Sequence, residues 1–221
     1  MKALLTAFRK DVLLQWRTRT QLLAIFTFGA STELLFSFAI GPNAEALRLH
    51  AAGFLWLSLL LSSTLTLAES FQSEMEDRAL EGLLLLPVDP RALYYAKALT
   101  NWAQLTLLGI GLIPIMVVLY DAGTTRLLEL FGIVALGAAG LSAPGTLYSA
   151  MTSQARAKQT LLPLLLFPLI VPVLLSAVKA TSLLILGDPM GQVAGWAKLL
   201  LAFNLIHWSV CGLLFGRVVE D

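Results

Sequence analysis

The sequence has few charged residues and only one cysteine. Of its 221 residues, 13% are Asp, Glu, Lys or Arg, and 57% are hydrophobic. Soluble domains carry about 25% charged residues, so this chain has too few to cover the surface of a water-soluble fold. Cys211 has no second cysteine, which excludes an internal disulfide and a cysteine-based metal site. The net charge of +1 gives no reason to expect nucleic acid as a partner.

Motifs for nucleotide hydrolysis and for catalysis are also missing. The sequence contains no GxxxxGK[ST] phosphate loop, no HExxH and no GxSxG. Its two histidines, His50 and His207, are far from ligand spacing. We therefore predict a non-catalytic chain without a bound metal or cofactor of its own, which suits the membrane half of a transporter whose energy source is a separate subunit. A membrane enzyme acting on lipids is the contrasting class, and it would need a nucleophile or a metal site beside the acidic residues of 69–81.

Long apolar runs dominate the sequence. Five runs contain no Asp, Glu, Lys or Arg, and a sixth is interrupted only by Glu33. A bilayer core of about 30 Å needs about 20 apolar residues in a helix, whereas barrel strands alternate over about 10. We predict an all-α, polytopic membrane protein that forms one domain over residues 1–221. Its six spans are expected at about residues 20–41, 50–68, 98–120, 128–150, 159–178 and 196–216.

The distribution of Lys and Arg predicts the orientation. With six spans, eleven of these residues lie on the side of the two termini and four on the other side. The excess of positive charge places both termini in the cytoplasm. Before the first span, apolar residues recur near every fourth position, which favours an interfacial helix over residues 1–18 on the lipids of the inner leaflet. These residues are Met1, Leu5, Phe8, Val12 and Trp16. The alternative is a plain cytoplasmic extension of the first span.

The longest cytoplasmic loop is predicted at residues 69–97. An acidic stretch is followed by the apolar patch 83–86, which ends at Pro87. Asp89 and Pro90 then supply an N-cap and a first-turn proline for the third helix. An apolar patch at this face needs cover from lipid, from the bundle or from a partner protein. The alternative is a solvated acidic face whose leucines dip into lipid.

Several polar residues and prolines lie inside the spans. Glu33 marks either a transport path or proton relay, or an acid hydrogen-bonded to a neighbour such as Ser31 or Thr32. One face of the last span carries a polar stripe that either lines a path, with His207 as a metal or haem-iron ligand, or joins helices by hydrogen bonds. The prolines of the fifth span indicate a hinge or gate, or a static kink. The stripe is Asn204, His207 and Cys211, and the prolines are Pro163, Pro168 and Pro172.

Two weaker patterns concern packing and the outer loops. Gly137 and Gly140 in the fourth span, and Gly212 with Gly216 in the sixth, indicate close helix packing. The apolar residues 183–186, followed by Gly-Asp-Pro, predict a re-entrant or surface helix on the outer side.

Residues 76–87, EDRALEGLLLLP, resemble the D-G-S-L-E-Q-L-x-L-x-P segment of the haem exporter protein B (CcmB) family. Further matches follow in the same order: Ala96-Lys97 with Trp102, then Ala143-Pro144-Gly145, then the proline run at 162–174. The resemblance extends over nearly the whole chain. The sequence departs from the pattern at Arg78, in place of glycine, at Gly82, in place of glutamine, and at Asn101, where some relatives have histidine.

This resemblance implies an ABC-2 exporter-like fold in a bacterial plasma membrane, with an N-terminal elbow helix and an outer helical element before the sixth span. It implies a dimer of this subunit on two ABC ATPase subunits, together with haem-handling membrane subunits and a haem chaperone. Haem is then the candidate cargo. The loop would supply the coupling helix that meets the ATPase, with contacts at Glu76, Asp77, Leu80, Glu81, Leu83, Leu84 and Pro87.

Two functions remain open after this comparison. The chain is either a permease that moves haem outward, or an energy transducer through which ATP hydrolysis releases a haem-loaded chaperone without transport by this subunit. A haem path would need a polar or aromatic lining with an iron ligand, and the sequence offers only His207.

Overall fold

Six long helices make up the described part of the chain. The computed structural model describes residues 19–70, 90–153 and 158–220, and no strand occurs in these ranges. Each helix is long and apolar enough to cross a membrane, which confirms the predicted all-α, six-span class. The predicted interfacial helix at 1–18 lies outside these ranges. The helices are α2 (Arg19–Ile40), α3 (Ala44–Glu69), α6 (Pro90–Tyr120), α7 (Leu127–Thr152), α8 (Lys158–Leu186) and α9 (Val193–Glu220).

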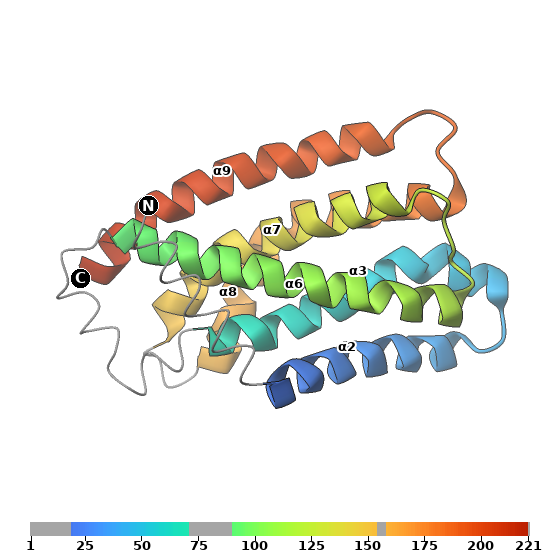
Figure 1. Ribbon diagram of the computed structural model, residues 1–221, viewed down its shortest axis with the longest axis horizontal. Helices are drawn as coiled ribbons and strands as arrows, with labels where there is room; N and C mark the ends of the chain where they lie inside the picture. Colours follow the sequence, from blue (N-terminus) through green and yellow to red (C-terminus); the bar gives the residue numbers. More distant parts are fainter. Residues whose placement is uncertain (1–18, 71–89, 154–157, 221) are drawn as a thin grey trace.

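The helices run side by side in one bundle, with α2 and α9 on opposite sides (Figure 1). α3 and α7 lie in the centre: α3 packs on α2, α6, α7 and α8, and α7 packs on α3, α6, α8 and α9. Successive helices alternate in direction, so their termini gather at two ends. We call the end holding Ser70, Pro90 and Thr152 the proximal end, and the end holding Ile40, Tyr120 and Leu186 the distal end.

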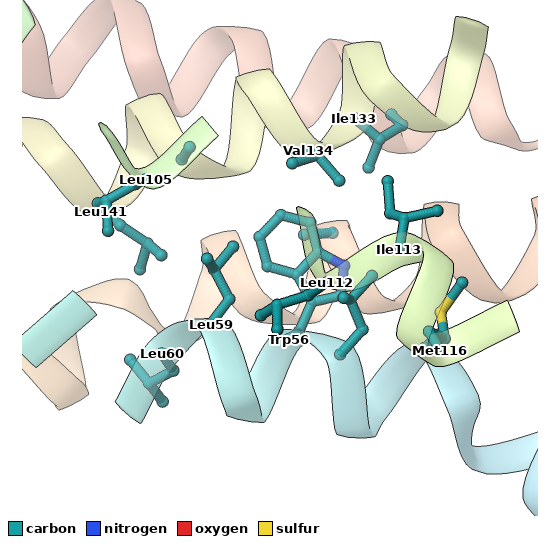
Figure 2. Close-up of a cluster of buried hydrophobic side chains, with 14 of the residues drawn as sticks. Trp56, Leu59, Leu60, Leu105, Leu112, Ile113, Met116, Ile133, Val134 and Leu141 are labelled. Atoms are coloured by element: carbon teal, nitrogen blue, oxygen red, sulfur yellow. The ribbon is translucent and has the colours of Figure 1, made fainter. Parts of the chain in front are cut away.

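The core is centred on Trp56 of α3 (Figure 2). Its ring lies between α3 and α7 and is 1% exposed, and its Nε1–H donates a hydrogen bond of 2.9 Å to Thr181 Oγ1 of α8. A Cβ at Gly137 would lie 2.1 Å from the ring, so only glycine leaves room for Trp56 there. Gly137 therefore allows three helices to meet, in agreement with its predicted packing role. Large apolar side chains also cover the outside of the bundle, such as Val118 and Leu128, as expected for lipid contact.

The helices extend beyond the charge-free windows of the sequence. α6 begins at Pro90, as Asp89-Pro90 predicts, and α3 begins at Ala44. Charged residues such as Glu45 and Arg91 lie in the first turns of α3 and α6, where each helix leaves the hydrocarbon. A span predicted only from charge-free residues therefore begins later than the helix does. The expectation of a separate outer helix at 183–186 is wrong, because α8 continues unbroken to Leu186. The helix ends only at Gly187, whose φ of 109° suits glycine alone.

Asp188 caps the first turn of α9 at the distal end. Its Oδ2 accepts a hydrogen bond of 3.0 Å from the Val193 N–H, and its Oδ1 accepts one of 2.7 Å from the Gln192 N–H. These bonds from Val193 and Gln192, with the nearby charge of Arg126, hold the pKa of Asp188 below its usual range. The ionised carboxylate is thus the form that stabilises the start of α9.

Replacing Asp188 by alanine is expected to lower the melting temperature of the purified protein at neutral pH. Because the folded-state pKa is depressed, this stabilisation is present above the ordinary carboxyl pKa and is lost as the pH falls through the lowered value. Melting curves of wild type and Asp188→Ala in detergent should therefore stay apart at neutral pH and converge only as the pH falls below about 4. Asp188→Asn keeps one acceptor oxygen and should fall between the two. A gap between wild type and Asp188→Ala that stayed constant with pH would contradict this role.

Candidate functional site

The predicted coupling residues lie outside the described part of the chain. These are Glu76, Asp77, Leu80, Glu81, Leu83, Leu84 and Pro87. The structure does describe the two points where this segment joins the bundle, Ser70 after α3 and Pro90 at the start of α6. Both points lie at the proximal end (Figure 1).

A buried polar cluster ties the end of α3 to α6. Lys97 Nζ donates a hydrogen bond of 2.7 Å to the Ser70 carbonyl, and Asn101 Nδ2 donates one of 3.0 Å to Ser70 Oγ. Lys97 and Asn101 are 6% and 2% exposed. The last carbonyls of a helix lack partners within the helix and carry the negative end of its dipole. A lysine ammonium is therefore a suitable partner for the end of α3.

The same cluster reaches α7. Asn101 Nδ2 also donates a hydrogen bond of 2.9 Å to Thr146 Oγ1, and Ser149 Oγ donates to the Leu67 carbonyl in the last turns of α3. We call Ser70, Lys97, Asn101, Thr146 and Ser149 the proximal node. It joins three helices at Ser70, where the 71–89 segment begins, and lies about two turns along α6 from Pro90, where that segment ends.

On the distal side of the proximal node, side chains of α6 and α9 donate hydrogen bonds to backbone carbonyls of α7. The acceptors lie on successive turns of α7, and the distances are 2.9 to 3.1 Å. In a hydrocarbon environment a buried donor without an acceptor is strongly unfavourable, so these bonds determine which helices can be neighbours. The pairs are Tyr94 with Ala143, Trp102 with Ala135, Asn204 with Leu136 and Trp208 with Ala139.

The residues of the predicted polar stripe do not converge on one site. Asn204 is used in the bond to α7, and Cys211 is buried in an apolar cluster with Tyr94 and Phe215. His207 is half-buried and stays within its own helix: its Nδ1 lies 3.0 Å from the Phe203 carbonyl, and the two rings stack at 3.7 Å. In the described ranges no three His, Cys, Asp or Glu side chains are grouped so that they could hold a metal ion.

The three prolines lie within a continuous α8. Pro168 and Pro172 occupy its exposed face, and Pro163 is half-buried. Each proline removes one backbone donor and so leaves the carbonyl four residues earlier without its helical partner. Pro172's own carbonyl accepts a hydrogen bond of 2.7 Å from Ser176 Oγ.

Sequence reasoning did not identify the proximal node. The sequence singles out Lys97 only as a match to the family pattern, and Asn101 only as a departure from that pattern. The available signal was the spacing of Lys97 and Asn101, four residues apart and therefore on one face of α6. That spacing does not reveal which helix the face will meet.

The fold and these contacts define a class of protein. It is a polytopic α-helical membrane protein in which polar side chains of the described ranges mainly join helices. Residues 2–220 match the family model described as CcmB protein, and the chain belongs to the CcmB family.

Curated relatives agree with this assignment. The chain is 29% identical over 210 residues to "Heme exporter protein B" of Bradyrhizobium diazoefficiens, covering 93% of this chain and 92% of the relative. It is 28% identical over 196 residues to the protein of the same name from Pseudomonas aeruginosa, covering 89% and 88%. The Rhodobacter capsulatus protein of that name is 36% identical over 141 residues, covering 64% of this chain and 65% of that protein, just under two thirds of its length.

Proposed function

We propose that this chain is the membrane subunit of an ABC-type complex that exports or delivers haem for cytochrome c maturation in the bacterial plasma membrane. The match to the CcmB family over nearly the whole chain carries this proposal. The name of the curated relatives supports haem as the cargo. The absence of a phosphate-loop motif in the sequence supports ATP hydrolysis by a separate subunit.

The 71–89 segment is the proposed contact with the ATPase. Its leucines would fill a groove on the motor, and its carboxylates would meet basic residues at the rim. The proximal node supports this role, since Lys97 and Asn101 hold the first turns of α6 to the end of α3, where the segment begins. Closure of the motor would then move the helices as one body instead of bending their ends. The complex would contain two copies of this subunit, two ATPase subunits, the haem-handling membrane subunits and the haem chaperone, with both termini of this chain in the cytoplasm.

The prolines of α8 are the proposed place where the bundle bends during this movement. α8 contacts the central helices α3 and α7 as well as α9, so bending it would change the packing of the whole bundle. Pro168 and Pro172 lie on its outer face, where freed carbonyls allow curvature.

Energy transduction without transport is the second candidate function. In the described ranges, Asn204 Nδ2 donates to the Leu136 carbonyl of α7, the buried Asn204 Oδ1 has no partner, and His207 Nδ1 faces the Phe203 carbonyl of its own helix. This arrangement favours a subunit that transmits force over one that lines a haem path. Reconstituted vesicles would separate the two functions: ATP-dependent uptake of haem supports the permease, and release of the haem-loaded chaperone without uptake supports the transducer.

Replacing Leu80 and Leu84 together by aspartate tests the docking role. Two charges in an apolar contact are strongly unfavourable, so we expect the ATPase to be lost from the purified complex and ATP-driven chaperone release to disappear. Thr125→Asp, an exposed change at the distal end, is the control and should leave both unchanged. Normal ATPase recovery and turnover in the double variant would refute docking through this segment.

A further inference from the structure

Glu33 is a carboxylic acid buried in the middle of α2. It is 0% exposed, and neither of its side-chain oxygens has a hydrogen-bond partner among the described residues. The sequence suggests Ser31 and Thr32 as hydrogen-bond partners of Glu33, but neither bonds to it. Thr32 Oγ1 donates to the Phe28 carbonyl at 2.9 Å, and Ser31 is exposed. The surroundings of the acid must therefore come from other helices.

The register of α2 against α3 places Ser58 opposite Glu33. On one side of this position, a Cβ at Gly29 would lie 3.0 Å from Ser62 Oγ. On the other side, the rings of Phe36 and Phe54 stack at 4.6 Å. The two helices are antiparallel, and Glu33 and Ser58 each lie one turn from both contacts, on the facing sides. Two buried polar groups thus lie on facing sides of the α2–α3 contact.

Ser58, like Glu33, is fully buried without a hydrogen-bond partner for its side chain among the described residues. Ser62 Oγ, one turn away, is also unpartnered. An acid that carries its proton can donate to one of these hydroxyls, and this single bond would satisfy both an acid oxygen and a serine oxygen.

α6 closes the third side of this position. Tyr120 OH donates a hydrogen bond of 2.6 Å to the backbone carbonyl of Glu33, and both Tyr120 and Met116 are fully buried. Tyr120 is the titratable group of α6 that faces Glu33, and its hydroxyl is occupied by that carbonyl. The packing of α3 and α6 thus keeps water away from the acid.

No cation among the described residues of these three helices reaches Glu33. On α3, His50 and Arg48 lie eight and ten positions beyond Ser58, which is at least about 12 Å along the helix. Arg48 donates to the Ile185 carbonyl instead. On α6, Arg91 and Lys97 belong to the proximal end. An ionised carboxylate without a cation is very unfavourable in such a place.

We propose that Glu33 is a proton-binding site within the membrane, neutral in the packed bundle, with Ser58 Oγ on the facing side of α3 as the acceptor that its O–H reaches by rotation about the side-chain bonds. The carboxylate takes one proton from water when α2 closes on α3, and the neutral acid returns that proton when the two helices separate and water enters. Packing of α2 is thereby linked to binding of one proton. This site goes beyond the proposed haem function and does not depend on the identity of the cargo.

Infrared spectroscopy of the purified protein in lipid nanodiscs tests the proposal. At neutral pH, the wild type minus Glu33→Gln spectrum should contain the carbonyl stretch of one protonated carboxylic acid, shifted in heavy water. The matched control is Glu45→Gln, an exposed acid in the first turn of α3, whose difference spectrum should contain carboxylate bands only. A Glu33→Gln difference spectrum with carboxylate bands alone would overturn the proposal.

The variant Ser58→Ala tests the pairing and keeps the proposal testable if Glu33→Gln does not accumulate. Removing the acceptor should shift the protonated-acid band of the otherwise unchanged protein to higher frequency. A protein without any protonated-acid band at neutral pH, or a band that Ser58→Ala leaves in place, would refute the site as described.

Discussion

Replacing Asn101 by leucine is expected to uncouple ATP hydrolysis from the output of the complex. Asn101 joins Ser70 at the end of α3 to Thr146 of α7 through hydrogen bonds of 3.0 and 2.9 Å. Leucine of similar size would leave the buried Thr146 hydroxyl and the half-buried Ser70 hydroxyl without this donor, at a cost of about 1–3 kcal/mol in stability. The link between the ends of α3, α6 and α7 would then be weakened to the bonds of Lys97 and Ser149, so ATP turnover would continue while chaperone release or haem transport per ATP falls.

Two variants distinguish this effect from a general loss of structure. Asn101→His retains a ring N–H donor and should restore most of the coupling. Thr106→Val removes a hydroxyl of the same helix that has no hydrogen-bond partner in the described ranges, so it should leave both turnover and coupling unchanged. The ratio of released chaperone to hydrolysed ATP is the quantity to measure. If Asn101→Leu kept the wild-type ratio, the proximal node would not transmit force.

Substituting Gly137 by alanine should cause the largest loss of stability of any single methyl addition in the core. The added carbon would lie 2.1 Å from the Trp56 ring, well inside contact distance. Trp56 cannot easily retreat, because it is 1% exposed and bonded to Thr181 of α8. Overpacking of this kind costs about 1–3 kcal/mol, which would lower the melting temperature in detergent by several degrees.

Gly132→Ala is the matched control for this prediction. It adds the same methyl group to the same helix, at a position where a Cβ would meet nothing within 4 Å. Since alanine is the better helix former, Gly132→Ala should be neutral or slightly stabilising. Equal melting temperatures for the two variants would show that Trp56 adapts to the added carbon.

The class of the protein follows from composition and local pattern. Six apolar runs are long enough to cross a bilayer and lack the alternation of barrel strands, so six helices are the expected solution, and the structure contains them. The Asp89-Pro90 pair predicts the start of α6 because capping is a property of a few adjacent residues. Local rules did less well at 183–186, where the sequence predicts a separate outer helix after a span ending near residue 178, whereas α8 continues to Leu186.

Which helices pack against each other does not follow from local sequence patterns. The sequence places Asn204, His207 and Cys211 on one face of a helix. In the structure, however, Asn204 bonds to the backbone of α7, and His207 contacts the backbone of its own helix. The sequence also shows that Glu33 is an acid inside a span, but it does not show that Ser58 of α3 lies opposite Glu33. Periodicity along one helix reports which side chains share a face. Which helix meets that face depends on how all six pack together, because glycines, aromatic rings and buried donors on different helices must fit simultaneously.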